Sequence, residues 1–500
     1  MLTVVVFLPL AVALALLALP RVGGRQATWV WIAAAAVDLG LVVVLWWRYG
    51  AARAGQSGLA YETDLRWIPS LRSGYHVGVD GLSLPLLALT AGLFLACAVY
   101  SLRESHRARS FATLFLFLET VCLGLFAALD LILFFVFFDL SIVGMYFVIA
   151  GWGHGDNLRS ALKFFLYTFF GSLALLLGFI GLYLAAEPHT FDMVALIRQM
   201  PLAGRPVTGV LVLLAVCLGL AVKTPTVPFH TWLPPAHTDA PAAGSAILAG
   251  VLLKMGAYGF VRIAMPMLPD TWRRYAPVIV VVGVVSVLYG ALVALAQENF
   301  KRMVAYTSVN HMGYIVLAVG AAGLLAGGDL QARELAVTGA VTQMVSHGLI
   351  TGALFLLAGV LYDRGHTYQM GEYGGLAGPA PLFGGLTAMA AFASLGLPGF
   401  SGFIAEFQIF TGSIAATAAS AIALLGIIVT AALFLRALQR LFLGQPRAPV
   451  ALAAIGDVTG AELASIAPLL LLALAIGVFP RFLLDLIEPA ARAAVGLVAR

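Results

Sequence analysis

The chain has 500 residues, of which 62% are apolar and only 10% are charged, and its formal net charge is +5. Apolar runs recur that are long enough to cross a bilayer, since a helix needs about 20 residues to span roughly 30 Å of hydrocarbon. This composition excludes a soluble globular protein, and a small positive charge on a membrane chain gives no reason to expect nucleic-acid binding.

Fourteen apolar runs follow one another, and helices are the expected spans because barrel strands would alternate apolar and polar residues. The first run lacks the basic start of a signal peptide, so we expect it to be retained. The sequence thus predicts an all-α integral membrane protein forming one polytopic domain over residues 1–500. The predicted spans are 2–20, 28–48, 83–102, 111–128, 131–151, 164–185, 208–227, 243–264, 276–296, 303–325, 335–361, 381–411, 415–441 and 464–486.

The cysteines give no metal or cofactor motif. Cys97, Cys122 and Cys217 lie in three separate apolar runs, and no CxxC pair or Cys/His cluster is present. The sequence also lacks a phosphate-binding GxxxxGK[ST] loop and a GxGxxG turn. We therefore expect no metal, iron–sulfur cluster, nucleotide or other cofactor in this chain.

The orientation in the membrane is only weakly indicated. Counted with the basic residues at the adjoining span ends, the connections after odd-numbered spans carry thirteen Lys and Arg residues, and those after even-numbered spans, with the C-terminal tail, also carry thirteen. Because the two counts are equal, the positive-inside rule does not decide the orientation. The tighter basic turns follow odd-numbered spans, which favours a cytoplasmic location for those turns and places both termini outside.

The interior of the chain suggests two five-helix repeats, about 111–264 and about 276–441, flanked by residues 1–102 and 464–486. Each repeat has, in fourth place, an apolar helix interrupted beside a charge: LAVKTPTVPFHTWLPP (220–235) and ASLGLPGFSGFIAEF (393–407). Paired interrupted helices are typical of inverted-repeat transporters with a central ion path. An ordinary proline kink is the alternative for either break alone.

Each break leaves backbone groups without helical partners. Prolines donate no N–H, so the carbonyls of Ala221 and Thr224 lose the partners that a regular helix would supply. In hydrocarbon such carbonyls must face protein or water. We expect the same consequence in the second interrupted helix. The break-forming residues are Pro225, Pro228, Gly396, Pro398 and Gly399.

Ionisable side chains well inside the predicted spans are the main functional signal. Each charge at mid-bilayer costs about 2.5–3.5 kcal/mol, so four unpaired ones would cost about as much as the whole stability of a typical domain. Such side chains must pair, face water or be neutral. They are Glu119, Asp139, Lys223, Lys254, His311, His347 and Glu406.

These options together describe a proton relay. Desolvation favours the neutral amine of a buried lysine, and a nearby carboxylate favours the ammonium, so a small movement can switch the lysine between holding and releasing a proton. We predict Asp139 and Lys223 as the switching pair and Glu406 as the terminal acceptor. Histidine suits a carrier because it titrates near neutral pH. The predicted carriers are Lys254, His311 and His347.

Structural roles compete with this interpretation at several positions. His347 could simply hydrogen-bond to another helix, His311 could belong to a polar packing cluster, and Glu119, a possible accessory residue, could pair with a basic loop residue. Capping near the membrane surface would equally explain three polar residues after the first break, His230, His237 and Asp239.

Five motifs resemble the antiporter-like membrane subunits of respiratory complex I, the NADH-quinone oxidoreductase, over essentially the whole chain. Glu406, where the L branch carries lysine, and the apparent lack of a long C-terminal lateral helix favour the M branch, equivalent to mitochondrial subunit 4. The resemblance implies roles in proton transfer for Asp139, Lys223, Lys254 and Glu406. Asp139 replaces the family's usual glutamate. The motifs are FFVFFDLSIVGMYF, LAVKTPTVPFHTWLPPAHTDAP, LLKMGAYGFVR, KRMVAYTSVNHMGY and LPGFSGFIAEF.

The resemblance implies a proton-translocating subunit in the inner (plasma) membrane, with both termini outside and L-like and N-like neighbours. It implies that NADH and quinone bind to other subunits, so this chain would be part of an enzyme without holding a redox centre. A subunit of an Mrp-type Na⁺/H⁺ antiporter or of a membrane hydrogenase is the alternative, and a membrane scaffold without ion traffic is a third possibility.

Overall fold

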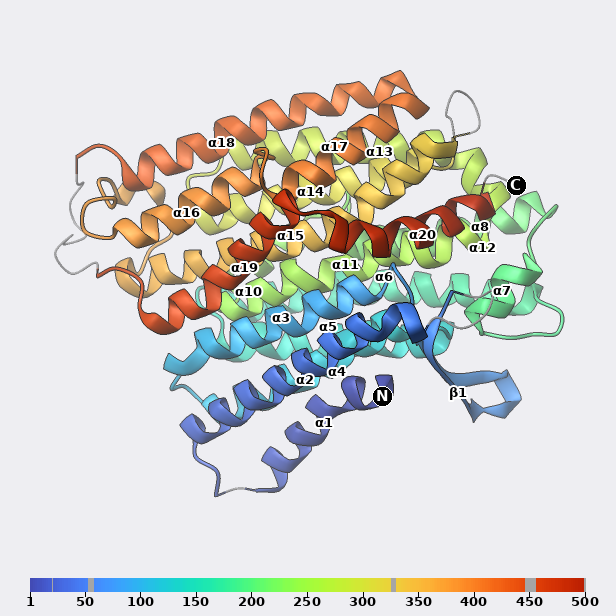
Figure 1. The fold of residues 1–500 in the computed structure, drawn as a ribbon, viewed down its shortest axis with the longest axis horizontal. Coiled ribbons are helices and arrows are strands. Elements are labelled where there is room, and N and C mark those ends of the chain that lie inside the picture. Colours follow the sequence, from blue (N-terminus) through green and yellow to red (C-terminus); the bar gives the residue numbers. More distant parts are fainter. Residues whose placement is uncertain (20, 53–57, 325–329, 446–455, 499–500) are drawn as a thin grey trace.

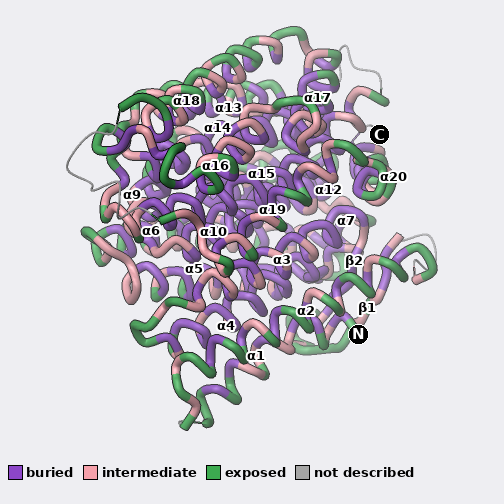
Figure 2. The backbone as a smooth tube through the Cα atoms, turned by 60° about the vertical axis from the view of Figure 1, so that its left-hand side comes forward, coloured by how far each residue is buried: buried purple, intermediate pink, exposed green. Residues whose placement is uncertain are grey.

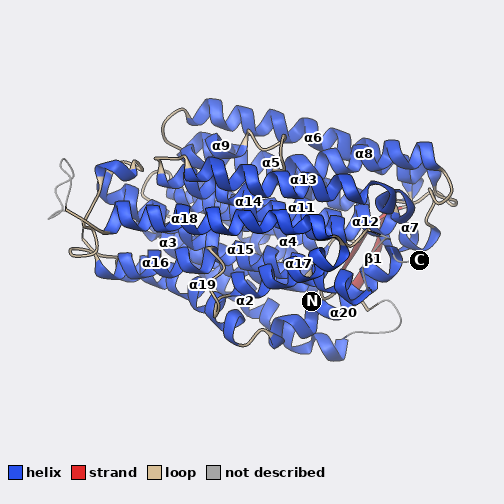
Figure 3. Ribbon diagram, turned by 90° about the horizontal axis from the view of Figure 1, so that it is seen from above, coloured by secondary structure: helices blue, strands red, loops and turns tan. Residues whose placement is uncertain are grey.

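The fold is a bundle of helices that lie side by side (Figure 1). The computed structural model describes residues 1–19, 21–52, 58–324, 330–445 and 456–498. Seen from above, the connections gather at the two ends of the bundle (Figure 3). The last residues of two predicted spans, Pro20 and Leu325, lie outside the described residues.

In its described residues, the first half of the chain contributes nine α-helices and one β-hairpin. They are α1 (Leu2–Ala18), α2 (Gly24–Ala52), β1 (Ala60–Ile68), β2 (Ser73–Val79), α3 (Leu84–Tyr100), α4 (Ala108–Ala127), α5 (Leu131–Trp152), α6 (Asn157–Ala185), α7 (Met193–Gln199), α8 (Pro206–Lys223) and α9 (Leu233–Asp239).

The second half begins with a helix that contains two π-helical segments, η3 and η4. Its elements are α10 (Ala242–Ile247), η3 (Leu248–Leu252), α11 (Leu253–Gly259), η4 (Phe260–Ala264), α12 (Met265–Met267), α13 (Pro269–Leu295), α14 (Phe300–Ala321), α15 (Leu330–Gly365), α16 (Pro381–Ser394), α17 (Ser401–Ala416), α18 (Leu424–Phe442), α19 (Gly460–Val478) and α20 (Arg481–Val498). Short 3₁₀ turns occur at Pro69–Leu71, Ser101–Arg103, Met370–Glu372 and Ala418–Ala423.

Within the described residues, 11 helical stretches are long and apolar enough to cross a membrane. The other three predicted spans correspond to α1, α14 and the interrupted pair α16–α17. The two interruptions occur where the sequence predicts them, between α8 and α9 and between α16 and α17. The prediction of a polytopic all-helical membrane fold is confirmed.

The prediction for the C-terminal end of the last span is wrong. The apolar run 464–486 is divided at Pro480, where α19 ends and a separate amphipathic helix, α20, begins. Leu483 and Ile487 of α20 are buried, whereas Arg481 and Asp485 are exposed. The buried face of α20 continues the apolar run, so composition alone hides the boundary.

A β-hairpin also occurs in the long polar stretch after α2, where the sequence predicts no strand. β1 pairs antiparallel with β2, with Thr63 opposite Val77 and Asp64 opposite His76. The His76 ring contacts Asp192, which caps α7 by accepting a hydrogen bond from the backbone N–H of Ala195 at 2.6 Å. The hairpin is thereby tied to α7 at one end of the bundle (Figure 1).

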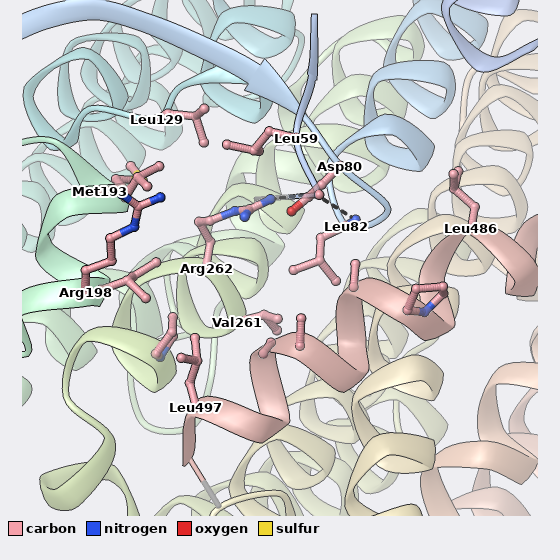
Figure 4. A pocket seen from close by; sticks show the side chains of 18 of the residues that line it. Leu59, Asp80, Leu82, Leu129, Met193, Arg198, Val261, Arg262, Leu486 and Leu497 are labelled. Carbon is pink, nitrogen blue, oxygen red and sulfur yellow. Dashed lines mark hydrogen bonds and ion pairs between the residues drawn. The ribbon is translucent and has the colours of Figure 1, made fainter. Parts of the chain in front are cut away.

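The same end of the bundle holds a pocket of about 300 Å³ between the residues that flank the hairpin, α7, η4 and α20 (Figure 4). An ion pair between Arg262 and Asp80, 2.6 Å apart, lies in it, and Arg262 Nε donates to the Tyr258 hydroxyl at 2.8 Å. The rest of the lining is mainly apolar, with Arg198 as a further cation. This ion pair holds the end of η4 against the loop before α3.

Burial distinguishes central from peripheral helices (Figure 2). The most apolar stretch of α15 is 100% buried and that of Ala242–Met267 is 94% buried, whereas those of α2, α6 and α13 are 39% buried. Lys254 and His347 are therefore carried by the helices that lipid does not reach. Their charges must be satisfied by other protein groups or by water.

Candidate functional site

Lys254 and His347 form the centre of the polar interior. Lys254 lies in α11, between the π-helical segments η3 and η4, and is fully buried. Its Nζ is 2.6 Å from Nδ1 of His347 on α15 and also contacts the carbonyl oxygen of Ala249 in η3. A π-segment disturbs the regular hydrogen-bond ladder of a helix, and such segments are frequent at functional sites. Here the wider turn presents a carbonyl to the lysine.

His311 continues this contact towards the second break. Its ring lies edge-on to that of His347, with centroids 5.3 Å apart. The Nε2 atom of His311 is 3.2 Å from the carbonyl oxygen of Ser394, the last residue of α16. The carbonyl that ends this half-helix therefore faces a histidine in place of a helical N–H.

A cavity of about 10 Å³ separates the two histidines from Glu406. That volume is about what one water molecule needs. Its lining includes five buried polar atoms that have no hydrogen-bond partner among the described residues, a setting in which a bridging water is expected. They are His311 Nδ1, His347 Nε2, Gln343 Oε1, Thr351 Oγ1 and Ser394 Oγ.

The second break is shaped around Glu406. Gly396 has a φ of +77°, a conformation that glycine adopts without the steric cost borne by other residues. A Cβ atom at this position would overlap Oε2 of Glu406. Glycine is thus required twice here, for the backbone turn and for the close approach of the carboxyl group.

The first break holds Lys223, the last residue of α8. Its Nζ donates to Ser141 Oγ on α5 at 2.8 Å and lies 4.8 Å from the centroid of the Phe138 ring. Asp139, on the same helix, acts electrostatically on Lys223 and interacts with Ser172, but it is more than 4.0 Å from the lysine nitrogen. The predicted switching pair is therefore in electrostatic range without direct contact, and Ser141 binds the lysine.

Three backbone groups at the first break have hydrogen-bond partners. The carbonyl of Ala221, which Pro225 leaves without a helical donor, accepts from the N–H of Thr226 at 3.1 Å. The carbonyl of Val222 accepts from the Trp232 indole N–H at 2.9 Å, and the N–H of Val227 donates to Ser286 Oγ at 3.0 Å. The interruption is thus a stabilised structure and more than a simple kink.

Two residues near the first break are more buried than the sequence suggests. His237, for which capping was one expected explanation, is fully buried and its ring stacks on Phe355 at 4.4 Å, and neither ring nitrogen is bonded within the described chain, so no capping contact is seen there. Lys301, which the sequence places in a basic connection, is also fully buried and donates to the carbonyl of Ala240. Their positions follow from tertiary packing that a single sequence does not show.

A polar pocket of about 380 Å³ opens next to these residues. It is lined by Tyr100, His154, Asp363 and Glu462 and reaches Pro241 to Ala243, directly after the carbonyl that Lys301 binds. The pocket therefore offers polar groups between the loop end of the bundle and the buried interior.

Glu119 stands apart from the central row. It is fully buried in α4, and both of its carboxyl oxygens lack a hydrogen-bond partner in the described chain, so the predicted alternative of pairing with a basic loop residue is wrong. Asp38 of α2 is also fully buried with both carboxyl oxygens lacking a partner in the described chain, and it was not among the predicted residues. A lone acid in the apolar run 28–48 is the signal that could have identified it.

Candidate metal ligands do not gather in this interior. Across the part of the chain that the structure describes, no group of three or more His, Cys, Asp or Glu side chains is arranged to hold a metal ion. The polar interior is instead built from single lysines, histidines and carboxyl groups on different helices. Such an arrangement can accept and release protons.

Comparison with known proteins gives one consistent result. The family described as NADH:quinone oxidoreductase/Mrp antiporter, TM, matches residues 128–434. NADH-quinone oxidoreductase subunit M of Rhodobacter capsulatus is 38% identical over 504 residues, covering 98% of this chain and 95% of that protein.

Solved structures agree with this result. A chain of respiratory complex I from Thermus thermophilus superposes with a TM-score of 0.87 at 30% identity, with 100% of both chains covered. A chain of the Mrp complex from Dietzia sp. DQ12-45-1b has a TM-score of 0.85 at 22% identity, covering 100% of this chain and 99% of that one, which shows a common fold. The chain belongs to the family of NADH:quinone oxidoreductase and Mrp antiporter transmembrane subunits.

Proposed function

We propose that this chain is a proton-translocating membrane subunit of a quinone-reducing complex I, of the subunit M type. The name of its Rhodobacter capsulatus relative supports this assignment. The observation that carries the mechanism is the buried row Lys254–His347–His311, which continues through the small cavity to Glu406. NADH oxidation and quinone reduction take place in other subunits, and L-like and N-like subunits are the neighbours in the inner membrane.

Histidine chemistry explains how a proton passes the centre of this row. An imidazole can accept a proton at one ring nitrogen and release one from the other. Nδ1 of His347 faces Lys254, its Nε2 is buried without a hydrogen-bond partner in the described chain, and the residue lines the cavity shared with Glu406. A proton received from the lysine can therefore leave on the opposite side of the ring, towards the carboxyl group.

The Lys223 end supplies the electrostatic control. The ammonium lies at the carbonyl end of α8, where a helix stabilises positive charge. Asp139 adds a nearby negative charge without fixing the lysine in a direct ion pair. A displacement of α5 would change that distance and so alter whether Lys223 holds its proton.

The polar pocket beside Lys301 provides the access route from the loop end of the bundle in this proposal. We place that end on the cytoplasmic side and both termini outside, as the basic turns favour. The two interrupted helices then belong to two inverted repeats, about 111–264 and about 276–441. The first repeat contributes Lys254 at one end of the row, and the second contributes Glu406 at the other end.

Glu406 and the two lysines argue against the competing functions. The resemblance implies lysine where Glu406 stands in the L-type and Mrp subunits, which disfavours sodium–proton exchange. A structural scaffold would gain nothing from burying Lys223 and Lys254, because each buried charge costs free energy.

The experiment uses the complete complex in proteoliposomes and follows NADH-driven proton uptake together with quinone reduction. Lys223→Ala and Glu406→Gln should assemble, keep electron transfer and lose most proton uptake. Glu372→Gln makes the same chemical change at an exposed position and should behave like the unaltered complex. Unchanged uptake in both Lys223→Ala and Glu406→Gln would show a scaffold, and sodium-dependent uptake would establish the antiporter.

A further inference from the structure

Two acids outside the central row are buried without a partner in the described chain. Asp38 on α2 and Glu119 on α4 are each 0% exposed, and none of their four carboxyl oxygens has a hydrogen-bond partner among the described residues. The hydroxyl of Thr120 and the indole N–H of Trp31, on the same two helices, are in the same condition. Buried polar groups of this kind call for an explanation, because most buried polar atoms in proteins are hydrogen-bonded.

Helix register places the two acids at the same level. Gly24 at the start of α2 lies beside Ala108 at the start of α4, and the Trp31 ring packs against those of Phe111 and Phe115, with centroid distances of 6.1 and 5.0 Å. The helices are therefore parallel. Asp38 lies seven residues beyond Trp31, or about 10.5 Å along the axis at 1.5 Å per residue.

Counting residues along α4 in the same way places Glu119 at a similar height along the helix axis. This residue is four positions beyond Phe115 and eight beyond Phe111, which is on average about 9 Å further along the axis. Asp38 and Glu119 thus meet at one depth, about midway along α4. In agreement with this, Asp38 acts electrostatically on Glu119.

Among the described residues, no cation compensates this pair. The only charged group there that acts on Glu119 is Asp38, and no described cation acts on Asp38, whereas Lys223 in the central row has both Asp139 and a hydroxyl ligand. An unpaired buried carboxylate is too costly to persist, so the pair must hold at least one proton. The two carboxyl groups do not hydrogen-bond to each other, since none of their oxygens has a partner among the described residues, so a proton is held by one acid and not shared between them.

Cys122 lies near both this pair and Lys223. This residue is one turn beyond Glu119 on α4, and both Glu119 and Lys223 act on it electrostatically. Cys97 of α3 is a further thiol beside Glu119. The titratable groups around the pair are therefore these two thiols and, past Cys122, the amine of Lys223.

We propose that Asp38 and Glu119 form a second proton-holding site that exchanges a proton with Lys223. The O–H bond of one acid breaks and an N–H bond forms on the neutral amine, directly or by way of water, and no electrons are exchanged. The inference rests on the proposed function, since the proton has a destination only if Lys223 belongs to a proton path. It adds a lateral store at the Lys223 end of the proposed proton path.

Infrared difference spectra of the complete complex, oxidised against NADH-reduced, test the site directly. A carboxylic-acid carbonyl band should change on reduction, shift in D₂O, and disappear in Asp38→Asn and in Glu119→Gln. Glu119→Asp keeps an acid and should retain a shifted band. Asp156→Asn makes the same chemical change at an exposed loop position and should leave the spectrum unaltered.

Proton uptake by the same proteoliposomes gives the second readout. Asp38→Asn and Glu119→Gln should slow uptake about tenfold, the factor that corresponds to one pKa unit. Unchanged spectra and uptake in both variants overturn the inference. If Asp38→Asn or Glu119→Gln fails to assemble, Asp38→Glu and Glu119→Asp are measured in their place, because both keep an acid. A carboxylic-acid band that shifts in neither of these two variants also overturns the inference.

The two proposals fail in different ways. If Glu406→Gln abolishes uptake while Asp38→Asn and Glu119→Gln change nothing, the central row stands and the lateral store is rejected. If Glu406→Gln and Lys223→Ala also change nothing, the proposed function itself is rejected, and the carboxylic-acid band alone then reports whether the pair holds a proton.

Discussion

The two interrupted helices stabilise the backbone at their breaks in different ways. The first, α8–α9, is broken by prolines, and side chains from Trp232 and Ser286 satisfy its backbone. The second, α16–α17, turns through Gly396 and leaves the Ser394 carbonyl to a histidine. The first break is held by fixed hydrogen bonds, and the second is held by close packing around a carboxyl group.

The charges also sit at opposite kinds of helix end. Lys223 is the last residue of α8, where unsatisfied carbonyls stabilise a cation, whereas Glu406 lies in the second turn of α17, past the strongest part of the positive end. The lysine is therefore controlled mainly by its helix and by α5. The glutamate depends on its immediate contacts, which makes the second break the more sensitive of the two.

Gly396→Ala should have the largest effect. Left-handed backbone costs a non-glycine residue about 1–2 kcal/mol, and the added Cβ would also displace the Glu406 carboxyl group. We expect proton uptake to fall to the level of Glu406→Gln. Gly399→Ala is the matched control, because Gly399 also has a positive φ, of +99°, but has open space at the Cβ position. Equal uptake in the two variants would contradict the packing argument.

Trp232→Phe tests the hydrogen-bonded break. It leaves the buried carbonyl of Val222 without its donor, which should cost about 1–3 kcal/mol and lower the thermal midpoint of the complex. Trp272→Phe removes a similar indole bond, to Val319, away from both breaks. Both variants should be destabilised, and only Trp232→Phe should also slow proton uptake. A parallel loss of uptake in Trp272→Phe would show that the effect is not specific to the break.

Ser141→Ala should have a smaller effect, confined to the Lys223 end. The variant removes the hydroxyl that accepts from the ammonium, so uptake should slow severalfold while assembly is preserved. Ser346→Ala is the comparison at the second break, since that hydroxyl bonds to the hydroxyl of Ser401 at 2.8 Å. The prediction fails if Ser346→Ala slows uptake as much as Ser141→Ala does.

The smallest effect should come from a change of pH at the contact between His76 and Asp192, which ties the hairpin to α7. Burial favours the neutral His76 ring, but the Asp192 carboxylate, with Glu62 at 2.8 Å, outweighs it and raises the pKa of His76 to about 9. The charged contact of His76 with Asp192 and Glu62 is called the clamp. Because the pKa of His76 is raised above its usual value of about 6.5, the clamp is complete below pH 6.5 and is lost as the pH rises through 9.

Hydrogen exchange at the start of α7 measures this clamp. Protection of the Ala195 amide should decrease as pH is raised towards 9, after correction for the intrinsic pH dependence of exchange. His76→Gln should remove that decrease while leaving the second break unaffected. Protection that stays constant in the unaltered protein would rule out the clamp.

Composition and patterning are enough to predict most of the fold. Long apolar runs and misplaced prolines identify the spans and both interruptions, because hydrocarbon imposes these patterns on any spanning helix. The hairpin and the α19–α20 boundary were not predicted. A short paired strand has little sequence pattern by which it can be recognised. The buried face of the amphipathic helix α20 is apolar, so its residues were included in the preceding predicted span.

The site was predictable by residue type and less so by geometry. Lys254 and His347 were expected to be carriers, and the structure places them in contact. The roles of Asp139 and Lys223 remain predictions, since the sequence could not show that Ser141 binds the lysine. The full burial of His237 was not predicted, because it depends on the packing of α9 against α15, which no local pattern encodes.

The cavity before Glu406 has a consequence for which ions can travel the row. At about 10 Å³ it has room for one water molecule and no more. A proton crosses such a gap by exchanging bonds through that water, so nothing larger has to enter. A metal cation would have to bring or find a whole shell of oxygen ligands in the same space. On the proposed function, the size of this cavity would by itself favour protons over metal cations.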